Sequence, residues 1–209
     1  MGVQNYKLKI TCLIFMFLVS TISVNAQMNM SGMHHNVKNA SKNIFLLMMD
    51  TMMVKMENIP IAATPESDFI YQMIPHHEGA IAMAGYEIAH GKDAQMIQLA
   101  KSILTEQSIE VQQMRMWLTL PGTKTPNLHL YNTDMGETMK IMMDTMPADS
   151  QLKNIDRAFA LVMIPHHQAA IDMAKVLLKY SKQPTLTGYG NLLISNEQIE
   201  IEQMKEFLN

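Results

Sequence analysis

Hydrophobic side chains recur at three- and four-residue intervals over residues 94–118 and 188–208, with few runs of β-branched residues. This spacing is typical of amphipathic helices rather than strands. A further helix is expected to begin at Thr64, the N-cap residue, with Pro65 in the first helical position. Gly91 is the expected end of that helix. The pattern therefore predicts an all-α protein.

The chain repeats itself after 90 residues. MIPHHEGAIAMA at 73–84 returns as MIPHHQAAIDMA at 163–174, and IEVQQMRMWL at 109–118 returns as IEIEQMKEFL at 199–208. The sequence MMDTM also occurs twice, at 48–52 and at 142–146. Each half is thus expected to contain a Met-rich helix, a helix with the Pro-His-His motif and a third helix, in that order.

The repeat predicts the architecture. Two helical hairpins, 65–118 and 150–208, are expected to pack as an antiparallel four-helix bundle, with the Met-rich helices covering an end or a side. Pro75 and Pro165 fall inside the predicted helices and remove a hydrogen bond from each. A kinked helix is expected at both, because the apolar pattern continues on both sides of the proline.

The first residues resemble an export signal. Lys7 and Lys9 precede the apolar run ITCLIFMFLVSTISV, and a small-residue cleavage site ends at Ala26. The run is short for a membrane span. The predicted organisation is a signal peptide at 1–26, a flexible tail at 27–42, the first helical repeat at 43–120, a linker at 121–134 and the second helical repeat at 135–209.

Composition narrows the chemistry. Hydrophobic residues make up 48% of the chain and charged residues 17%, which suits a globular protein. Removal of the signal leaves 14 basic and 19 acidic residues, so nucleic acid is not an expected partner. The single cysteine, Cys12, leaves with the signal. A soft-metal site in the mature chain would therefore have to use thioethers and imidazoles, and the 23 methionines are unusually many.

The Pro-His-His helices concentrate such groups on one face. At about 100° per residue, a single arc of about 120° contains Met73, His76, His77, Ala80 and Met83. The second copy places Met163, His166, His167, Ala170 and Met173 in the same way. Imidazole and thioether together favour Cu(I), with Ag(I) as its chemical mimic, whereas imidazole alone also admits Zn(II), Cu(II) or Ni(II).

A purely structural interpretation stays open. Methionine stripes commonly fill cores, and a buried histidine is often only a hydrogen-bonded core residue. For the Met-rich helices this interpretation is favoured, since each can bury its methionines on one packed face. Glu110 and Glu200 occupy equivalent positions in the repeat, where their carboxylates either orient the imidazoles or face solvent.

The predicted tail offers a second soft-metal cluster. Packing in a core does not explain methionines in a polar segment, so this segment is interpreted as a metal-capturing tail. Its candidate ligands are Met28, Met30, Met33, His34 and His35.

The two M-I-P-H-H segments, each followed by a Gln-Met helix, resemble domain-of-unknown-function family 305. The resemblance covers residues 43–209. It implies a ferritin-like helical bundle in an exported protein, and some members bind copper or silver through methionine and histidine. Carried over to this chain, the resemblance points to Met73, His76, His77, Met83 and Met114, and equally to Met163, His166, His167, Met173 and Met204.

The expected function is extracytoplasmic binding of Cu(I), or of Ag(I), for sequestration or for handover to an exporter or chaperone. Periplasmic or secreted localisation follows from the signal. No enzymatic turnover is expected, because the candidate sites lack a hydroxyl or thiol nucleophile. The alternatives are a metal oxidase acting on Cu(I) or Fe(II), and an interaction module that grips apolar helices through methionine surfaces. We expect acid to weaken metal binding as imidazoles protonate.

Overall fold

The computed structural model of the protein describes residues 42–60, 62–122, 124 and 127–209. Its elements are α1 (Ile44–Glu57), α2 (Pro65–His90), α3 (Ala94–Trp117), α4 (Leu128–Asp144), the short 3-10 helix η1 (Asp149–Gln151), α5 (Ile155–Tyr180) and α6 (Pro184–Leu208). No strand occurs within these ranges, which confirms the predicted all-α class. None of the described helices is long and apolar enough to cross a membrane.

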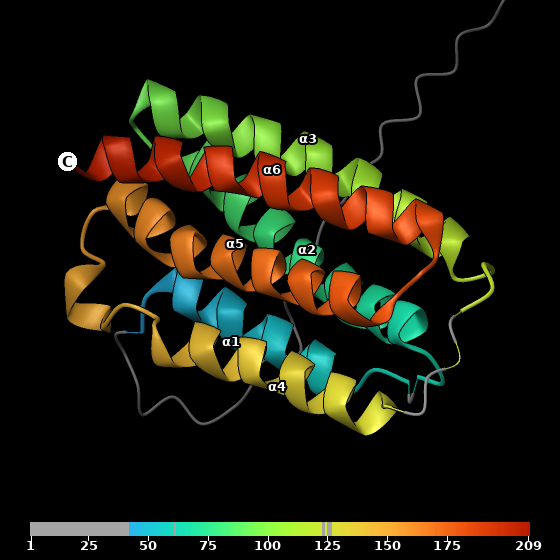
Figure 1. Ribbon diagram of the computed structural model, residues 1–209. Helices are drawn as coiled ribbons and strands as arrows, with labels where there is room; N and C mark the ends of the chain where they lie inside the picture. The colour runs from blue at the N-terminus through green and yellow to red at the C-terminus, as the bar shows by residue number, and fades with distance from the viewer. Residues whose placement is uncertain (1–41, 61, 123, 125–126) are drawn as a thin grey trace, which may run out of the picture. The chain divides into compact units, whose positions relative to one another are not determined.

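The four long helices form two hairpins, α2–α3 and α5–α6, and α2 packs against α5. Figure 1 shows α3 and α6 on one side of the α2–α5 pair, and α1 and α4 on the other. Helix α1 packs on α2, and α4 packs on α5. The predicted four-helix bundle is thus confirmed, with the Met-rich helices covering one side of it.

Local sequence fixes where the hairpin helices begin. The Thr64 hydroxyl accepts the backbone N–H of Ser67 at 3.2 Å, and Pro65 follows in the first helical position. Helix α3 begins after Asp93, whose carboxylate accepts the N–H groups of Gln95 and Met96. These caps satisfy N–H groups that have no partner within the helix.

Both internal prolines lie inside continuous helices, so neither helix restarts at its proline, and the kink expected there stays a prediction. Pro75 is in the middle of α2 and Pro165 is in the middle of α5, and each helix has 26 residues. The Pro-His-His motif therefore keeps helical geometry on both sides of the proline, so the two histidines stay on the face predicted for them.

The connection between the repeats is shorter than the predicted linker 121–134, because α4 begins at Leu128. The buried side chains of Tyr131, Met135 and Met142 form one face of this helix. Tyr131 packs edge-to-face on Tyr180 of α5, with ring centroids 5.6 Å apart. Burial of this face stabilises the helix. The turn-forming residues nearby favour a linker in the sequence alone, so the start of this helix is not predicted from it.

Gly79 marks a close approach of α1 to α2. A Cβ atom at this position would lie 2.8 Å from the sulfur of Met52, closer than van der Waals contact permits. The second copy of the motif has Ala169 at the equivalent position. The absence of a side chain at Gly79 therefore gives Met52 room to pack against α2.

The last turn of α2 contains a buried carboxyl group. Glu87 is completely buried and lies beside Asp156, whose carboxylate accepts the backbone N–H groups of Lys92 and Asp93 at 2.7 Å each. Burial, together with the proximity of Asp156, raises the pKa of Glu87 to about 8. At neutral pH this carboxyl is therefore mainly protonated.

We expect Glu87→Gln to remove a pH dependence from folding. A carboxyl whose pKa is raised on folding binds more protons in the folded state, so its contribution to stability falls between pH 4.5 and about 8. The glutamine variant should thus gain stability relative to the native protein as pH rises through this window. Urea unfolding at pH 5 and pH 8 checks this, with Glu57→Gln at an exposed position as the control. Equal pH slopes for native protein and Glu87→Gln would contradict it.

Candidate metal centre

The two Pro-His-His motifs meet where α2 packs against α5. All four of their imidazoles are completely buried. The rings of His76 and His166 stack across this boundary, with centroids 3.8 Å apart and planes inclined by 32°. The other two histidines, His77 and His167, turn toward α3 and α6. The repeat thus brings four imidazoles together in the core of one bundle.

His77 and His167 are each held by a glutamate of the neighbouring hairpin helix. His77 Nε2 lies 2.8 Å from Glu110 Oε2, and His167 Nε2 lies 2.8 Å from Glu200 Oε2. The two pairs occupy equivalent positions in the repeat, and of the two alternatives left open by the sequence they favour the one in which the carboxylates bind the imidazoles. Such carboxylate–histidine pairs fix the tautomer and orientation of metal-ligating histidines in other proteins.

The hydrogen-bond partners assign the tautomers of three imidazoles. A carboxylate or carbonyl oxygen only accepts, so Nε2 is the donor in His77 and His167. His166 Nε2 likewise donates to the backbone carbonyl of His76 at 3.2 Å. With Nε2 as the donor, Nδ1 is the nitrogen that offers a lone pair to a metal. None of these three buried Nδ1 atoms has a hydrogen-bond partner among the described residues.

His76 is less satisfied still. Neither of its ring nitrogens has a hydrogen-bond partner within the described part of the chain. Burial, reinforced by His77 and His167, lowers its pKa well below 6.5. The pKa of His166 is lowered in the same direction, by burial first and then by the neighbouring histidines. Both rings are therefore neutral at physiological pH, the form in which imidazole binds a metal.

The same core contains buried methionines. The six that are predicted as ligands within the two repeats are completely buried: Met73, Met83 and Met114, and their repeat equivalents Met163, Met173 and Met204. Ala80 and Ala170, on the same helix faces, are also fully buried, and their small side chains leave space between the larger ones. The core thus contains thioether and neutral imidazole donors and little else that could ligate a soft ion.

The methionines of α1 and α4 are less uniform. Met49 and Met52 of α1 and Met142 of α4 are buried, which agrees with a packing role. Met143 is 39% exposed, so α4 does not bury all its methionines on one face. The predicted tail ligands Met28, Met30, Met33, His34 and His35 lie outside the described residues.

Nitrogen and oxygen donors alone do not form a ready site. In the described ranges, no group of three or more His, Cys, Asp or Glu side chains is placed to hold one metal ion. The buried thioethers of the same core are the further donors available, and sulfur favours soft ions.

The residues of two polar contacts in the site are not predicted from the sequence. The Tyr189 hydroxyl lies 3.1 Å from His77 Nε2 and donates to Glu110 Oε2 at 3.2 Å. The repeat equivalent of Tyr189 is Leu99, so no repeated pattern marks this position. The other contact joins α3 to α6, where Gln107 Nε2 donates to Glu197 Oε1 at 3.1 Å.

Glu197 is a buried acid beneath the two glutamate–histidine pairs. It is 4% exposed, and burial raises its pKa well above 4.5, with Glu200 and Glu110 adding to the effect. Burial thus favours the neutral, protonated form of Glu197 over the carboxylate. Gln107 and Glu197 are 90 residues apart, so the repeat offset does contain a signal for this pair.

Comparison with solved structures finds similar folds. CopM in its Ag-bound form, obtained by soaking, shares 28% sequence identity at a TM-score of 0.52, and the match covers 70% of this chain and 96% of CopM. CopM in the Cu(I)-bound form shares 26% identity at a TM-score of 0.51, over 68% of this chain and 94% of CopM. A DUF305 fragment from Deinococcus radiodurans shares 24% identity at a TM-score of 0.50, over 71% and 98% respectively, which supports the fold alone.

No curated protein matches the chain. The sequence profile described as Domain of unknown function (DUF305) matches it twice, over residues 17–118 and 119–208. These two segments divide the chain between α3 and α4, in agreement with the repeat. Since the matches together span most of the sequence, this protein belongs to the DUF305 family.

Proposed function

We propose that this protein binds Cu(I), with Ag(I) as a chemical mimic, in the histidine–methionine core between α2 and α5. The bound ion is cargo, which the protein sequesters or hands over to an exporter or chaperone. The ligands are drawn from His76, His77, His166 and His167 and from the six buried methionines around them. The proposal is one of binding and release, and it includes no turnover.

The observation that carries this proposal is the set of imidazole lone pairs that no protein group uses. A buried polar atom without a hydrogen bond costs about 1–3 kcal/mol of folding stability. Here such atoms occur at Nδ1 of three histidines and at both nitrogens of His76. A protein that retains several of them in one place has a use for them, and a metal–nitrogen bond satisfies a lone pair.

The donor set favours a soft monovalent ion. Thioethers are soft and uncharged, so they stabilise Cu(I) and Ag(I) better than hard cations. The structures of CopM in Ag-bound and Cu(I)-bound forms support this choice, because they share the fold of this chain. CopM has also been obtained in a Cu(II)-bound form, so the oxidation state needs a direct measurement.

Export to the periplasm or the medium is part of the proposal. It rests on the signal-like sequence at 1–26 and the cysteine-free chain that would remain after cleavage. Thioether and imidazole ligands suit an oxidising compartment, where thiols are lost to disulfides. The Met- and His-rich segment 27–42 is proposed to capture metal first.

Anaerobic titration with Cu(I) against a competing chelator tests the proposal. The mature chain, residues 27–209, should compete for the ion, and a variant with all four motif histidines changed to Ala should lose this ability while remaining helical by circular dichroism. The loss should be large, since each lost ligand worth about 1.4 kcal/mol raises Kd tenfold. Equal competition by both proteins would contradict histidine ligation.

A further inference from the structure

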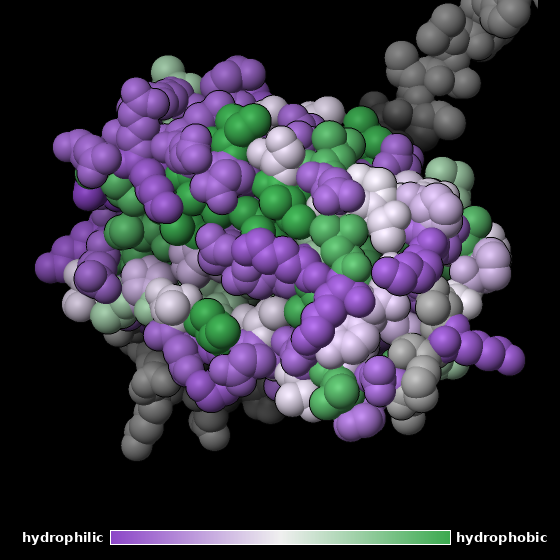
Figure 2. Space-filling model, in the orientation of Figure 1, coloured by the Kyte–Doolittle hydropathy of each residue, from purple (hydrophilic) through white to green (hydrophobic). Residues whose placement is uncertain are grey.

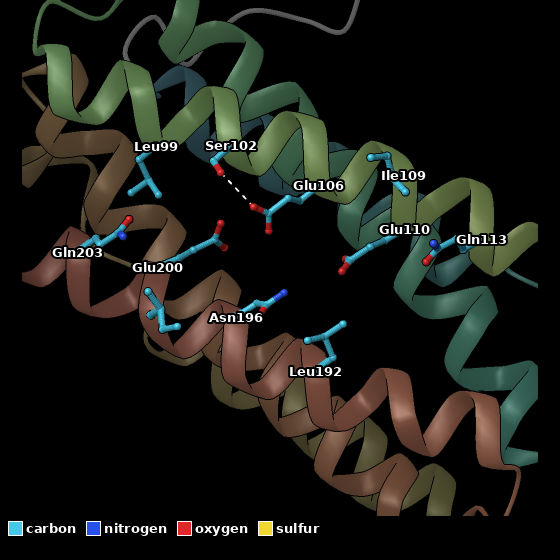
Figure 3. A pocket seen from close by; sticks show the side chains of 11 residues that line it. Leu99, Ser102, Glu106, Ile109, Glu110, Gln113, Leu192, Asn196, Glu200 and Gln203 are labelled. Carbon is cyan, nitrogen blue, oxygen red and sulfur yellow. Dashed lines mark hydrogen bonds between the residues drawn. The ribbon is translucent and has the colours of Figure 1, made fainter.

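A groove runs along the outer surface of the bundle between α3 and α6 (Figure 3). Its volume is about 400 Å³, and its described lining residues are Leu99, Ser102, Glu106, Ile109, Glu110, Gln113, Leu192, Asn196, Ile199, Glu200 and Gln203. Figure 2 shows hydrophobic side chains exposed over these two helices, among hydrophilic ones. The groove therefore has partly apolar walls and is open to solvent.

The groove reaches the buried histidines through two of its own lining residues. Glu110 and Glu200 keep 16% and 11% of their side-chain surface exposed, while the imidazoles that they bind have none. Figure 3 shows both carboxylates directed into the space between the helices. These carboxylates thus connect the groove with the interior.

The charge of the groove favours cations. Its lining includes three carboxylates, with Glu106 beside the two that bind histidine, and no lysine or arginine is among these described residues. Ile109 and Ile199 stand at the rim, about half exposed at 51% and 53%. A cleft of one charge with apolar walls concentrates ions of the opposite charge and speeds their association.

The two ends of the groove are related by the repeat, and the difference that touches a histidine–glutamate pair is Tyr189 in place of Leu99. The offset of 90 residues pairs Ser102 with Leu192, Glu106 with Asn196, Ile109 with Ile199, Glu110 with Glu200 and Gln113 with Gln203. Leu99 also lines the groove, whereas its repeat equivalent, Tyr189, is not among the lining residues. Tyr189 is instead buried against His77 and Glu110.

This difference makes the Glu110 end harder to pass. Glu110 Oε2 there accepts both the imidazole of His77 and the hydroxyl of Tyr189, at 2.8 and 3.2 Å. An ion passing this carboxylate would have to break both bonds and displace a phenol. At the other end, Leu99 offers no hydrogen bond, and the described contact of Glu200 with the interior is the single bond to His167.

We infer that Cu(I) enters and leaves the core through the α3–α6 groove, past Glu200 and His167, while Tyr189 closes the equivalent passage past Glu110 and His77. This inference rests on the proposed function. It assigns Glu200 a role in ion transfer in addition to its bond with His167. Tyr189 holds Glu110 and His77 in place and so closes their passage, which leaves the passage past Glu200 open. The ion would then reach both Pro-His-His motifs from the Glu200 end of the groove.

The repeat supplies a matched pair of test variants. Gln203→Trp places bulk beside Glu200, and Gln113→Trp places the same bulk beside Glu110. Stopped-flow mixing with a Cu(I)–chelator complex gives the rate of uptake, and excess chelator gives the rate of release. Gln203→Trp should slow both rates by about tenfold and leave Kd unchanged, because a route alters the barrier but not the end states. Gln113→Trp should leave both rates unchanged.

A third variant tests the role of Tyr189. Tyr189→Leu recreates the Leu99 side of the groove at the other end, so it should open a second passage. In that background Gln113→Trp should begin to slow uptake, and Gln203→Trp alone should slow it less than in the native protein. Circular dichroism verifies that each variant keeps its helices.

The outcomes separate the route from the function. If the native protein binds Cu(I) and neither tryptophan slows exchange, the ion does not use the groove. Equal slowing by both tryptophans in the native background overturns the assignment to the Glu200 end. If the native protein takes up no Cu(I), the proposed function itself fails, and the route fails with it.

Discussion

His76→Leu is expected to make the metal-free protein more stable while weakening its binding of Cu(I). Both ring nitrogens of His76 are buried without a hydrogen-bond partner among the described residues, and the side chain is completely enclosed. Replacement of such a group by an apolar one of similar volume removes a desolvation cost of about 1–3 kcal/mol. Urea unfolding of metal-free protein at pH 7 measures the gain.

The gain should increase in acid. The pKa of His76 is held well below 6.5 in the folded state, mainly by burial. Below pH 6.5 the unfolded chain takes up a proton that the folded chain does not, so this histidine lowers the native stability as pH falls. Leucine at this position removes that loss. The difference between His76→Leu and native protein should therefore be larger at pH 5 than at pH 7.

The same reasoning changes the expected pH dependence of metal binding. Free imidazole would begin to lose a metal to protons near pH 6.5. Because burial lowers the pKa values of His76 and His166, protons should compete for these two rings only at lower pH. Binding that stays unchanged from pH 7 to pH 5 would therefore be compatible with ligation by these two rings. The titration of the variant with all four motif histidines changed to Ala is the test that decides whether histidines are ligands.

His167→Leu is the control for His76→Leu. His76 is the first histidine of its Pro-His-His motif, whereas His167 is the second histidine of the other copy. His167 holds the carboxylate of Glu200, and its loss would leave that largely buried group without its imidazole. This variant should be destabilised, by about 1–3 kcal/mol. If His76→Leu is destabilised to the same extent, then His76 is a structural residue of the core and the proposal for it is wrong.

Added Cu(I) should reverse the order of stability. A ligand that binds only the folded state stabilises it in proportion to the logarithm of its concentration over Kd. The native protein should therefore gain more than His76→Leu from the same Cu(I) concentration. A residue that lowers stability when metal-free and raises it when loaded has been retained for binding, not for packing.

Much of this site follows from the repeat in the sequence. The 90-residue offset and helical spacing predict that Met73, His76 and His77 share a buried face, and the structure buries all three. The offset also singles out Glu110 and Glu200, which the structure places in hydrogen-bond contact with His77 and His167. Local periodicity is sufficient here because each contact joins neighbouring helices of one hairpin.

Contacts that break the repeat or cross between its halves were beyond that reasoning. The stack of His76 on His166 depends on how α2 packs on α5, which a helical wheel does not specify. Tyr189 belongs to the second half yet binds His77 of the first. The start of α4 at Leu128 depends on burial of its face against α5, which outweighs the turn-forming residues nearby.

Replacement of the buried methionines beside the histidines by leucine should abolish tight Cu(I) binding. The variant changes Met73 and Met83 of α2 and Met163 and Met173 of α5, all completely buried. Leucine conserves volume and costs less than about 1.5 kcal/mol at each site, so the bundle should persist. Loss of two sulfur ligands worth about 1.4 kcal/mol each would raise Kd about 100-fold. Chelator competition under anaerobic conditions measures this.

A matched set of methionines outside the histidine cluster provides the control. Met49 and Met52 of α1 and Met135 and Met142 of α4 are at most 1% exposed, so their change to leucine makes the same demand on packing. This control should bind Cu(I) like the native protein. Loss of binding in the control alone would move the site to the Met-rich helices, and loss in neither set would leave the imidazoles, Met114 and Met204 as the candidate ligands of the core. The soft-metal assignment depends on this comparison, because sulfur is what separates Cu(I) from the ions that histidine alone would admit.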